Sequence, residues 1–336
     1  MESRKVQQSG KSSFVVSLPS DWVKAYGIEK NEPLGMQVNS DGTISIFPSQ
    51  QPAQPISQEV VVCSHECTPD GLLRRLIGAY IRGCEAIDVR FNAKSYKEQH
   101  MVVSDFVSMM VGIEIVDEDE AHIRVRDIMD PGEMPMQKTM ARMNLITKKM
   151  LMESVSLIGQ GCTDASKSLK RMDNEVDRLW WLVARKHNIL LSSPSLAGAE
   201  GITLQQSSAC VLASRLVERI ADHAVRISIF AGQICPNGKP TAAALRLAQQ
   251  GNECIHAYEQ GMKAYSTLDP ALAEQTIVLS HGLSAGFKKI MSEGVRGIPS
   301  STVAFAYTLE SLLRVAEYTA AICETVIDHA PAKEKG

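Results

Sequence analysis

The chain has 336 residues, which exceeds the usual length of one domain and predicts two or three. Its 44% hydrophobic and 22% charged residues are typical of a globular protein, so a mainly disordered chain is excluded. A net charge of −3, from 35 Lys and Arg against 38 Asp and Glu, excludes a uniformly basic nucleic-acid coat protein but allows a local basic patch.

Two further features of the sequence indicate the cellular compartment of the protein. The sequence contains no run of 18 apolar residues that would predict a membrane span. Its first five residues are polar, unlike those of a secretory signal. We therefore expect a cytoplasmic protein whose eight scattered cysteines are mostly reduced and buried.

Residues 1–48 predict strands around one short helix. An apolar run at 14–18 follows a turn signal, and a helix then begins with Ser20 as its N-cap and ends at Gly27. A hairpin turn precedes Ile44 and Ile46, whose alternation predicts a half-buried strand. Residues 49–57, rich in proline and without charge, predict a linker.

Residues 58–135 predict a small α/β domain. Strand patterns occur at 60–63, 86–90, 113–116 and 122–125, and helical stripes of apolar residues lie over 72–80 and 102–110.

Residues 136–330 predict an all-helical body, followed by a tail at 331–336. Breaks at glycine and proline separate six helices, which we assign to two three-helix bundles at 136–235 and 236–330. The helices are predicted near 136–160, 163–189, 204–234, 240–266, 270–294 and 299–329. An internal repeat supports this division, because Leu216–His223 resembles Leu312–Tyr318 when Arg219 is aligned with Arg314.

Two acidic pairs in the first bundle suggest a metal site. Asp173 and Asp177 share one helix face, and Glu218 and Asp222 have the same spacing on the next helix. Four carboxylates suit a divalent cation such as Mg or Mn, or iron. The alternative is a solvated acidic face that is paired with nearby arginines, namely Arg171, Arg178, Arg215, Arg219 and Arg226.

Basic and hydroxyl side chains in the N-terminal segment suggest DNA contacts. Cations and hydroxyls on a two-stranded ribbon can contact phosphates and enter a major groove. The alternative is a solvated hairpin. The candidate residues are Arg4, Lys5, Lys11, Ser12, Ser13 and Lys24.

Other chemical motifs are weak. Cys63, His65 and Cys67 lack a second Cys/His pair nearby, so a strand-to-helix turn is favoured over zinc. His223 beside Asp222 is either a metal-linked or a packed side chain. No phosphate loop, dinucleotide fingerprint, nucleophile elbow or zinc-protease motif occurs, so we expect no enzyme.

Residues 4–48 resemble the AbrB/SpoVT swapped-hairpin DNA-binding domain. The resemblance rests on Arg4-Lys5-Val6, Gly10-Lys11, Ser17-Leu18-Pro19, Trp22-Val23-Lys24, Gly27-Ile28, Leu34 and Asp41-Gly42-Thr43-Ile44. It implies an intertwined homodimer whose paired hairpins form one small barrel, and DNA contacts from the basic residues.

Residues 136–330 resemble PhoU, the phosphate-uptake regulator. Asp173-x-x-x-Asp177 and the segment Leu216–His223 fit the acidic motifs of its first repeat, which implies a metal cluster there. In the second repeat Ser280, Ser284 and Leu313 replace acidic residues, so we expect metal in the first bundle alone. The combination resembles the archaeal fusions of the two domains.

These resemblances imply a dimeric, DNA-binding transcriptional regulator of phosphate uptake, with a helical body that senses a ligand or binds a partner. The alternative is a PhoU-like interaction protein that restrains a phosphate transporter or kinase. In that case the N-terminal domain serves only for dimerisation.

Overall fold

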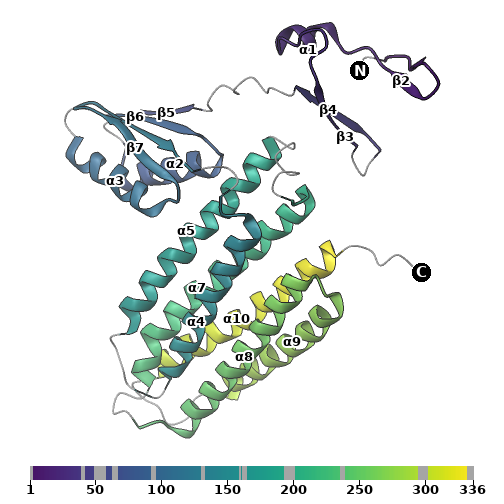
Figure 1. Cartoon of the computed structure of the whole chain (residues 1–336). Helices are drawn as coiled ribbons and strands as arrows, with labels where there is room; N and C mark the ends of the chain where they lie inside the picture. The colour runs from purple at the N-terminus through teal and green to yellow at the C-terminus, as the bar shows by residue number, and fades with distance from the viewer. Residues whose placement is uncertain are drawn as a thin grey trace. The chain divides into compact units, whose positions relative to one another are not determined.

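The computed structural model divides into two compact units, which are described separately (Figure 1). The head is Met1–Ser57 and the body is Gln58–Gly336. The predicted linker at 49–57, residues 63–66 of the Cys/His motif and the tail at 331–336 lie outside the described residues. The structure describes residues 3–38, 42–48, 58–62, 67–91, 96–129, 133–158, 160, 165–192, 201–234, 239–293 and 302–330.

The head consists of two antiparallel hairpins and one helix, as predicted. Strands β1 (Gln7–Ser9) and β2 (Ser13–Val15) form the first hairpin, and β3 (Leu34–Val38) and β4 (Ile44–Pro48) form the second. The turn between β1 and β2 begins at Gly10, whose φ of 73° favours glycine.

Helix α1 (Ser20–Ala25) follows the first hairpin, and Gly27 with φ 61° lies just beyond its end. The prediction that Ser20 is the N-cap is wrong. Pro19, in extended conformation, takes the cap position without a side-chain hydrogen bond, and Ser20 is already helical.

The head has almost no core in the single chain. Of its described residues only Pro48 is buried, and the two hairpins form separate sheets without a closed barrel. The predicted half burial of Ile44 and Ile46 is wrong for the single chain, where they are 57% and 36% exposed. No second layer covers them within the described part of the head.

The body begins with a four-stranded mixed sheet, in the order β5-β6-β8-β7. Strand β5 runs parallel to β6, and the other pairs are antiparallel. Ile87, Val89, Ile123 and Val125 alternate along the central strands and join the helices in one core. The elements are β5 (Gln58–Val62), α2 (Pro69–Ile81), β6 (Ala86–Arg90), α3 (Tyr96–Met109), β7 (Ile113–Glu118) and β8 (His122–Asp127).

Six long helices follow in the described residues, close to the predicted ranges. The first bundle has α4 (Met136–Ser156), α5 (Ala165–Ser192) and α7 (Leu204–Ile234). The second has α8 (Ala242–Thr267), α9 (Pro270–Glu293) and α10 (Thr302–His329). None of the helices that the structure describes is long and apolar enough to span a bilayer.

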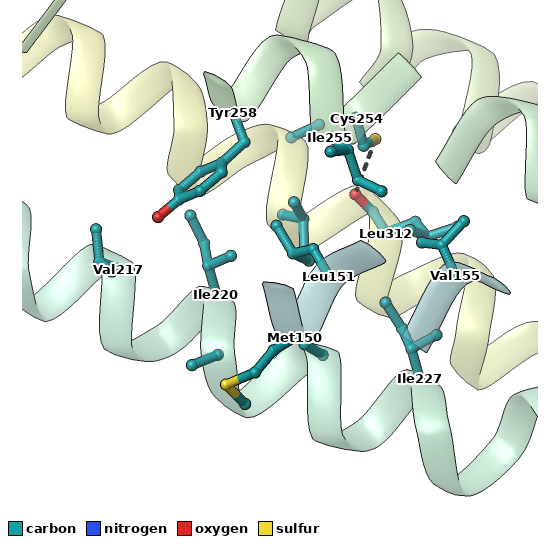
Figure 2. Packing of buried hydrophobic residues seen from close by; sticks show 14 of the residues in the cluster. Met150, Leu151, Val155, Val217, Ile220, Ile227, Cys254, Ile255, Tyr258 and Leu312 are labelled. Carbon is teal, nitrogen blue, oxygen red and sulfur yellow. Dashed lines mark hydrogen bonds between the residues drawn. The ribbon is translucent and has the colours of Figure 1, made fainter. Parts of the chain in front are cut away.

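One apolar core joins the two bundles (Figure 2). Side chains of α4 and α7 meet Tyr258 of α8 and Leu312 of α10 there. The Val155 side chain of α4 packs against the α8 backbone at Gly251, where a Cβ atom would lie 2.8 Å from Val155 Cγ1. The bundles therefore pack as one body.

Candidate functional site

Four carboxylates of the predicted site lie on two neighbouring helices of the first bundle. Helix α5 carries Asp173 and Asp177, and α7 carries Glu218 and Asp222. Their charges act on one another across the two helices. We call these four residues the acidic cluster.

Two members of the acidic cluster are buried with half of each carboxylate unsatisfied. Asp173 is 1% exposed, and its Oδ2 accepts a hydrogen bond from Lys170 Nζ at 2.7 Å. Glu218 Oε1 accepts one from Arg215 Nη1 at 2.9 Å. Asp173 Oδ1 and Glu218 Oε2 are buried and have no partner. Unsatisfied buried carboxylate oxygens are costly, and a cation would satisfy them.

Burial makes the carboxyl groups of Asp177, Glu218 and Asp222 harder to ionise. It raises the pKa of Glu218 to about 7 and that of Asp177 to about 6. The pKa of Asp222 is raised as well, first by partial desolvation and then by the charge of Asp173. Protons and cations would therefore compete for the cluster near neutral pH.

The basic partners of the cluster differ in part from the predicted ones. Of the predicted arginines, Arg215 pairs with Glu218, whereas Arg178 donates to the Met110 carbonyl at 3.1 Å. Arg226 lies 3.8 Å from Glu310 of α10. Arg171 and Arg219 form no salt bridge within the described chain. Lys170 was missed, although its position three residues before Asp173 is a helical pairing distance.

The carboxylate oxygens of the acidic cluster suit a hard cation, but they do not converge on a single point. Among the described residues, no three His, Cys, Asp or Glu side chains converge as a metal-ligand set. Binding a cation would therefore require the four side chains to move closer together.

The corresponding face of the second bundle is far less acidic. Ser280 and Ser284 of α9 and Leu313 of α10 are buried there. Glu317 is engaged by Arg314 Nη1 at 2.9 Å and Lys288 Nζ at 3.5 Å. This face offers one carboxylate, already neutralised by two cations.

His223 lies on α7 next to the cluster but faces the second bundle. Its ring centroid is 5.8 Å from that of Tyr318 on α10, and burial lowers its pKa. This contact fits the packed alternative better than a role as a metal ligand.

The predicted DNA-contacting residues all lie on the surface of the head. Lys11 and Ser12 lie in the turn between β1 and β2, Ser13 begins β2, and Lys24 lies on α1. Arg4 and Lys5 precede β1. The first hairpin therefore presents cations and hydroxyls from its entry and its tip.

The second hairpin presents an exposed apolar face. Met36 pairs with Ile46 and Val38 with Ile44 across the strands, which places all four side chains on one face. Met36 and Val38 are 65% and 73% exposed. An isolated hairpin with an uncovered apolar face is marginally stable in water, so this face requires a cover.

Comparisons with known proteins match two segments of the chain. Residues 140–230 match the PhoU domain family, and residues 7–54 match the family described as antidote-toxin recognition MazE, bacterial antitoxin. The chain thus joins a MazE/AbrB-type segment to a PhoU-type segment. The PhoU match covers the bundle that carries the acidic cluster.

The chain is also similar to solved structures. One of them is the crystal structure of PhoU from Pseudomonas aeruginosa, with 17% identity and a TM-score of 0.47 over 57% of this chain and 93% of that one. Comparison with curated protein sequences finds no match.

Proposed function

We propose that the chain is a homodimeric, DNA-binding transcriptional regulator of phosphate uptake. The observation that carries the proposal is the head, which combines an exposed basic hairpin with a second hairpin whose apolar face is uncovered. The matches to a MazE-type and a PhoU-type segment support a phosphate-regulator-like fusion. Such a protein acts on DNA and therefore belongs in the cytoplasm. We assign it no catalytic role.

The head supports dimerisation because one copy cannot bury its own apolar residues. A second copy would cover the face formed by Met36, Val38, Ile44 and Ile46 and complete a barrel from paired hairpins. Two-fold symmetry would then place two basic hairpins on the DNA, so the operator should be an inverted repeat.

The acidic cluster supports a metal-binding body. A divalent cation or iron would be held by Asp173, Asp177, Glu218 and Asp222, and it would satisfy the two unpartnered carboxylate oxygens. Elemental analysis should find less metal in Asp173→Asn/Asp222→Asn than in the wild type. Equal, near-zero metal in both proteins would leave a solvated acidic face.

The proposed function is tested by DNA binding over a salt series. Fluorescence anisotropy with the protein's own upstream region and with phosphate-transport promoters should show preference over scrambled DNA. Lys5→Ala/Lys11→Ala should weaken binding and reduce the slope of log affinity against log salt by about 3.6, because the dimer loses four phosphate contacts and each contributes about 0.9. Lys97→Ala/Lys138→Ala, which removes two exposed lysines of the body, is the matched control.

An unchanged slope in the Lys5/Lys11 variant would remove the head from DNA binding. No preference over scrambled DNA would favour the second candidate, a PhoU-like protein that restrains a phosphate transporter or kinase. The PhoU match over the first bundle supports that candidate. Capture of a phosphate transporter or kinase in pull-downs with a variant that lacks residues 1–52 would then establish the second candidate.

A further inference from the structure

The small α/β domain of the body carries a basic groove along α2. The groove has a volume of about 450 Å³. Its lining is one carboxylate, two glycines and three arginines, namely Glu59, Gly71, Arg74, Arg75, Gly78 and Arg82. We call it the α2 groove.

The groove exists because α2 has two distinct faces. Leu72, Leu76 and Tyr80 are buried in the core of the domain. Gly71, Arg75, Gly78 and Arg82 follow at spacings of four, three and four, so they share the opposite face. Gly78 contributes no side chain to the lining, and the end of Arg82 lies beside it.

Charge in the α2 groove is opposite to that of its surroundings. Residues 58–135 contain eight Lys and Arg against fifteen Asp and Glu, a net charge of −7. The groove itself has three guanidinium groups against Glu59, and Glu59 is paired with Arg82. Arg74 and Arg75 are exposed and form no ion pair with any described residue. Two unpaired like charges on adjacent residues leave a net charge of +2 for a ligand to neutralise.

Gly78 provides an independent observation. A glycine within a helix is less favourable than alanine, so a packing reason is usually found. At Gly78 an added Cβ would meet only the flexible end of Arg82, at 3.4 Å, and the backbone needs no left-handed conformation. Neither packing nor backbone geometry requires glycine here. By contrast, glycine at 71 has a packing reason, since an added Cβ would lie 3.0 Å from Thr68 Oγ1.

We propose that the α2 groove binds a phosphate group, either as inorganic phosphate or on a small phosphorylated molecule such as a nucleotide. The planar guanidinium groups of Arg74 and Arg75 match the oxygens of a phosphate in pairs. The dianionic charge of a phosphate balances the +2 of the groove. Gly78 leaves room for the ligand to approach the helix backbone.

The test is calorimetric titration of the full-length protein with inorganic phosphate, and separately with a nucleoside diphosphate, at ionic strength matched by chloride. Arg74→Gln/Arg75→Gln should weaken binding at least about tenfold, since it removes charge-assisted hydrogen bonds. Gly78→Leu keeps all three arginines but fills the groove, and should also abolish binding. Arg90→Gln/Arg126→Gln removes two exposed arginines of the same domain outside the groove, and should bind like the wild type.

Circular dichroism of each variant establishes that it is folded. Binding of the diphosphate alone would show that the organic part contributes, and the site would stand. Equal phosphate affinity in wild type and Arg74→Gln/Arg75→Gln, or no binding of either probe, would overturn the proposal. Loss of DNA affinity in that variant, without binding of either probe, would instead assign the arginines to DNA. The head variant Lys5→Ala/Lys11→Ala should retain phosphate binding, which separates this test from that of the proposed function.

Discussion

Arg185 of α5 is predicted to hold the α/β domain on the first bundle. Its side chain is 1% exposed and donates to Asp127 Oδ2 from Nε at 3.1 Å and from Nη2 at 2.6 Å. Nη1 donates to the carbonyls of Tyr80 and Cys84 at 2.6 and 3.0 Å, and the guanidinium lies 4.8 Å from the Tyr80 ring centroid. One side chain therefore joins α5 to α2, to the loop after α2 and to β8.

The expected loss of stability follows from the Asp127 carboxylate that Arg185→Met would leave without its ion-pair partner. Asp127 would keep only the Met129 N–H on its other oxygen, at 2.9 Å, with its side chain 13% exposed. Removing one partner of a buried ion pair typically costs about 3–5 kcal/mol. That is a large share of the roughly 5–15 kcal/mol by which a protein is stable. Met keeps the length and apolar stem of Arg, so little of the loss arises from a cavity.

Urea unfolding followed by tryptophan fluorescence measures the loss. Trp181 packs against the core of the α/β domain, so its emission reports on this contact. Arg178→Met is the matched control, because Arg178 lies on the same helix and donates one hydrogen bond to the same domain. We expect the control to lose only about 1 kcal/mol. Arg185→Met/Asp127→Asn should recover part of the loss by removing the unpaired charge. Equal losses in Arg185→Met and Arg178→Met would refute the reasoning.

Three further predictions concern the acidic cluster and the head. Because the folded pKa of Glu218 is raised from 4.5 to about 7, its stabilising contribution is full below pH 4.5 and is lost as pH rises through 7. The free energy of unfolding, measured with urea at pH 5 and 8, should therefore fall with rising pH, and Glu218→Gln should make this fall smaller by roughly 3 kcal/mol. Manganese should raise the melting temperature at pH 8 in the wild type but not in Asp173→Asn/Asp222→Asn, and equal shifts would exclude the cluster as its site. Val38→Asp should convert the proposed dimer to monomer in light scattering, whereas Leu145→Asp, at a similarly exposed apolar residue of α4, should leave the oligomeric state unchanged.

Periodicity was sufficient to predict the helical body. Apolar spacing and breaks at Gly and Pro place all six long helices within a few residues of the observed ends, because a long amphipathic helix repeats its signal over many turns. The acidic pairs could be predicted for the same reason, since a spacing of four fixes a shared face. Cap identity could not, because Pro19 and Ser20 are both acceptable at the start of a helix and only the backbone angles decide.

Long-range contacts could not be predicted from the sequence. Nothing local distinguishes Arg185, which is buried against residues about 60 to 105 positions away, from the exposed Arg171 on the same helix. The prediction that Ile44 and Ile46 are half-buried was wrong for a related reason. Alternation predicts that one face of a strand is covered but not whether the cover comes from the same chain.

Helix α5 links the acidic cluster to the α/β domain. Asp177 belongs to the cluster, and the next residue, Arg178, donates to the Met110 carbonyl of that domain. Arg185 and Asn188 continue the contact two and three turns further along. Because a helix moves largely as a rigid rod, a cation that draws Asp173 and Asp177 towards α7 must also displace these anchors or strain them. Metal binding should therefore alter amide hydrogen exchange at the end of α2 and in the loop after it, where Arg185 binds the carbonyls of Tyr80 and Cys84, and Arg185→Met should abolish that response while leaving metal content unchanged.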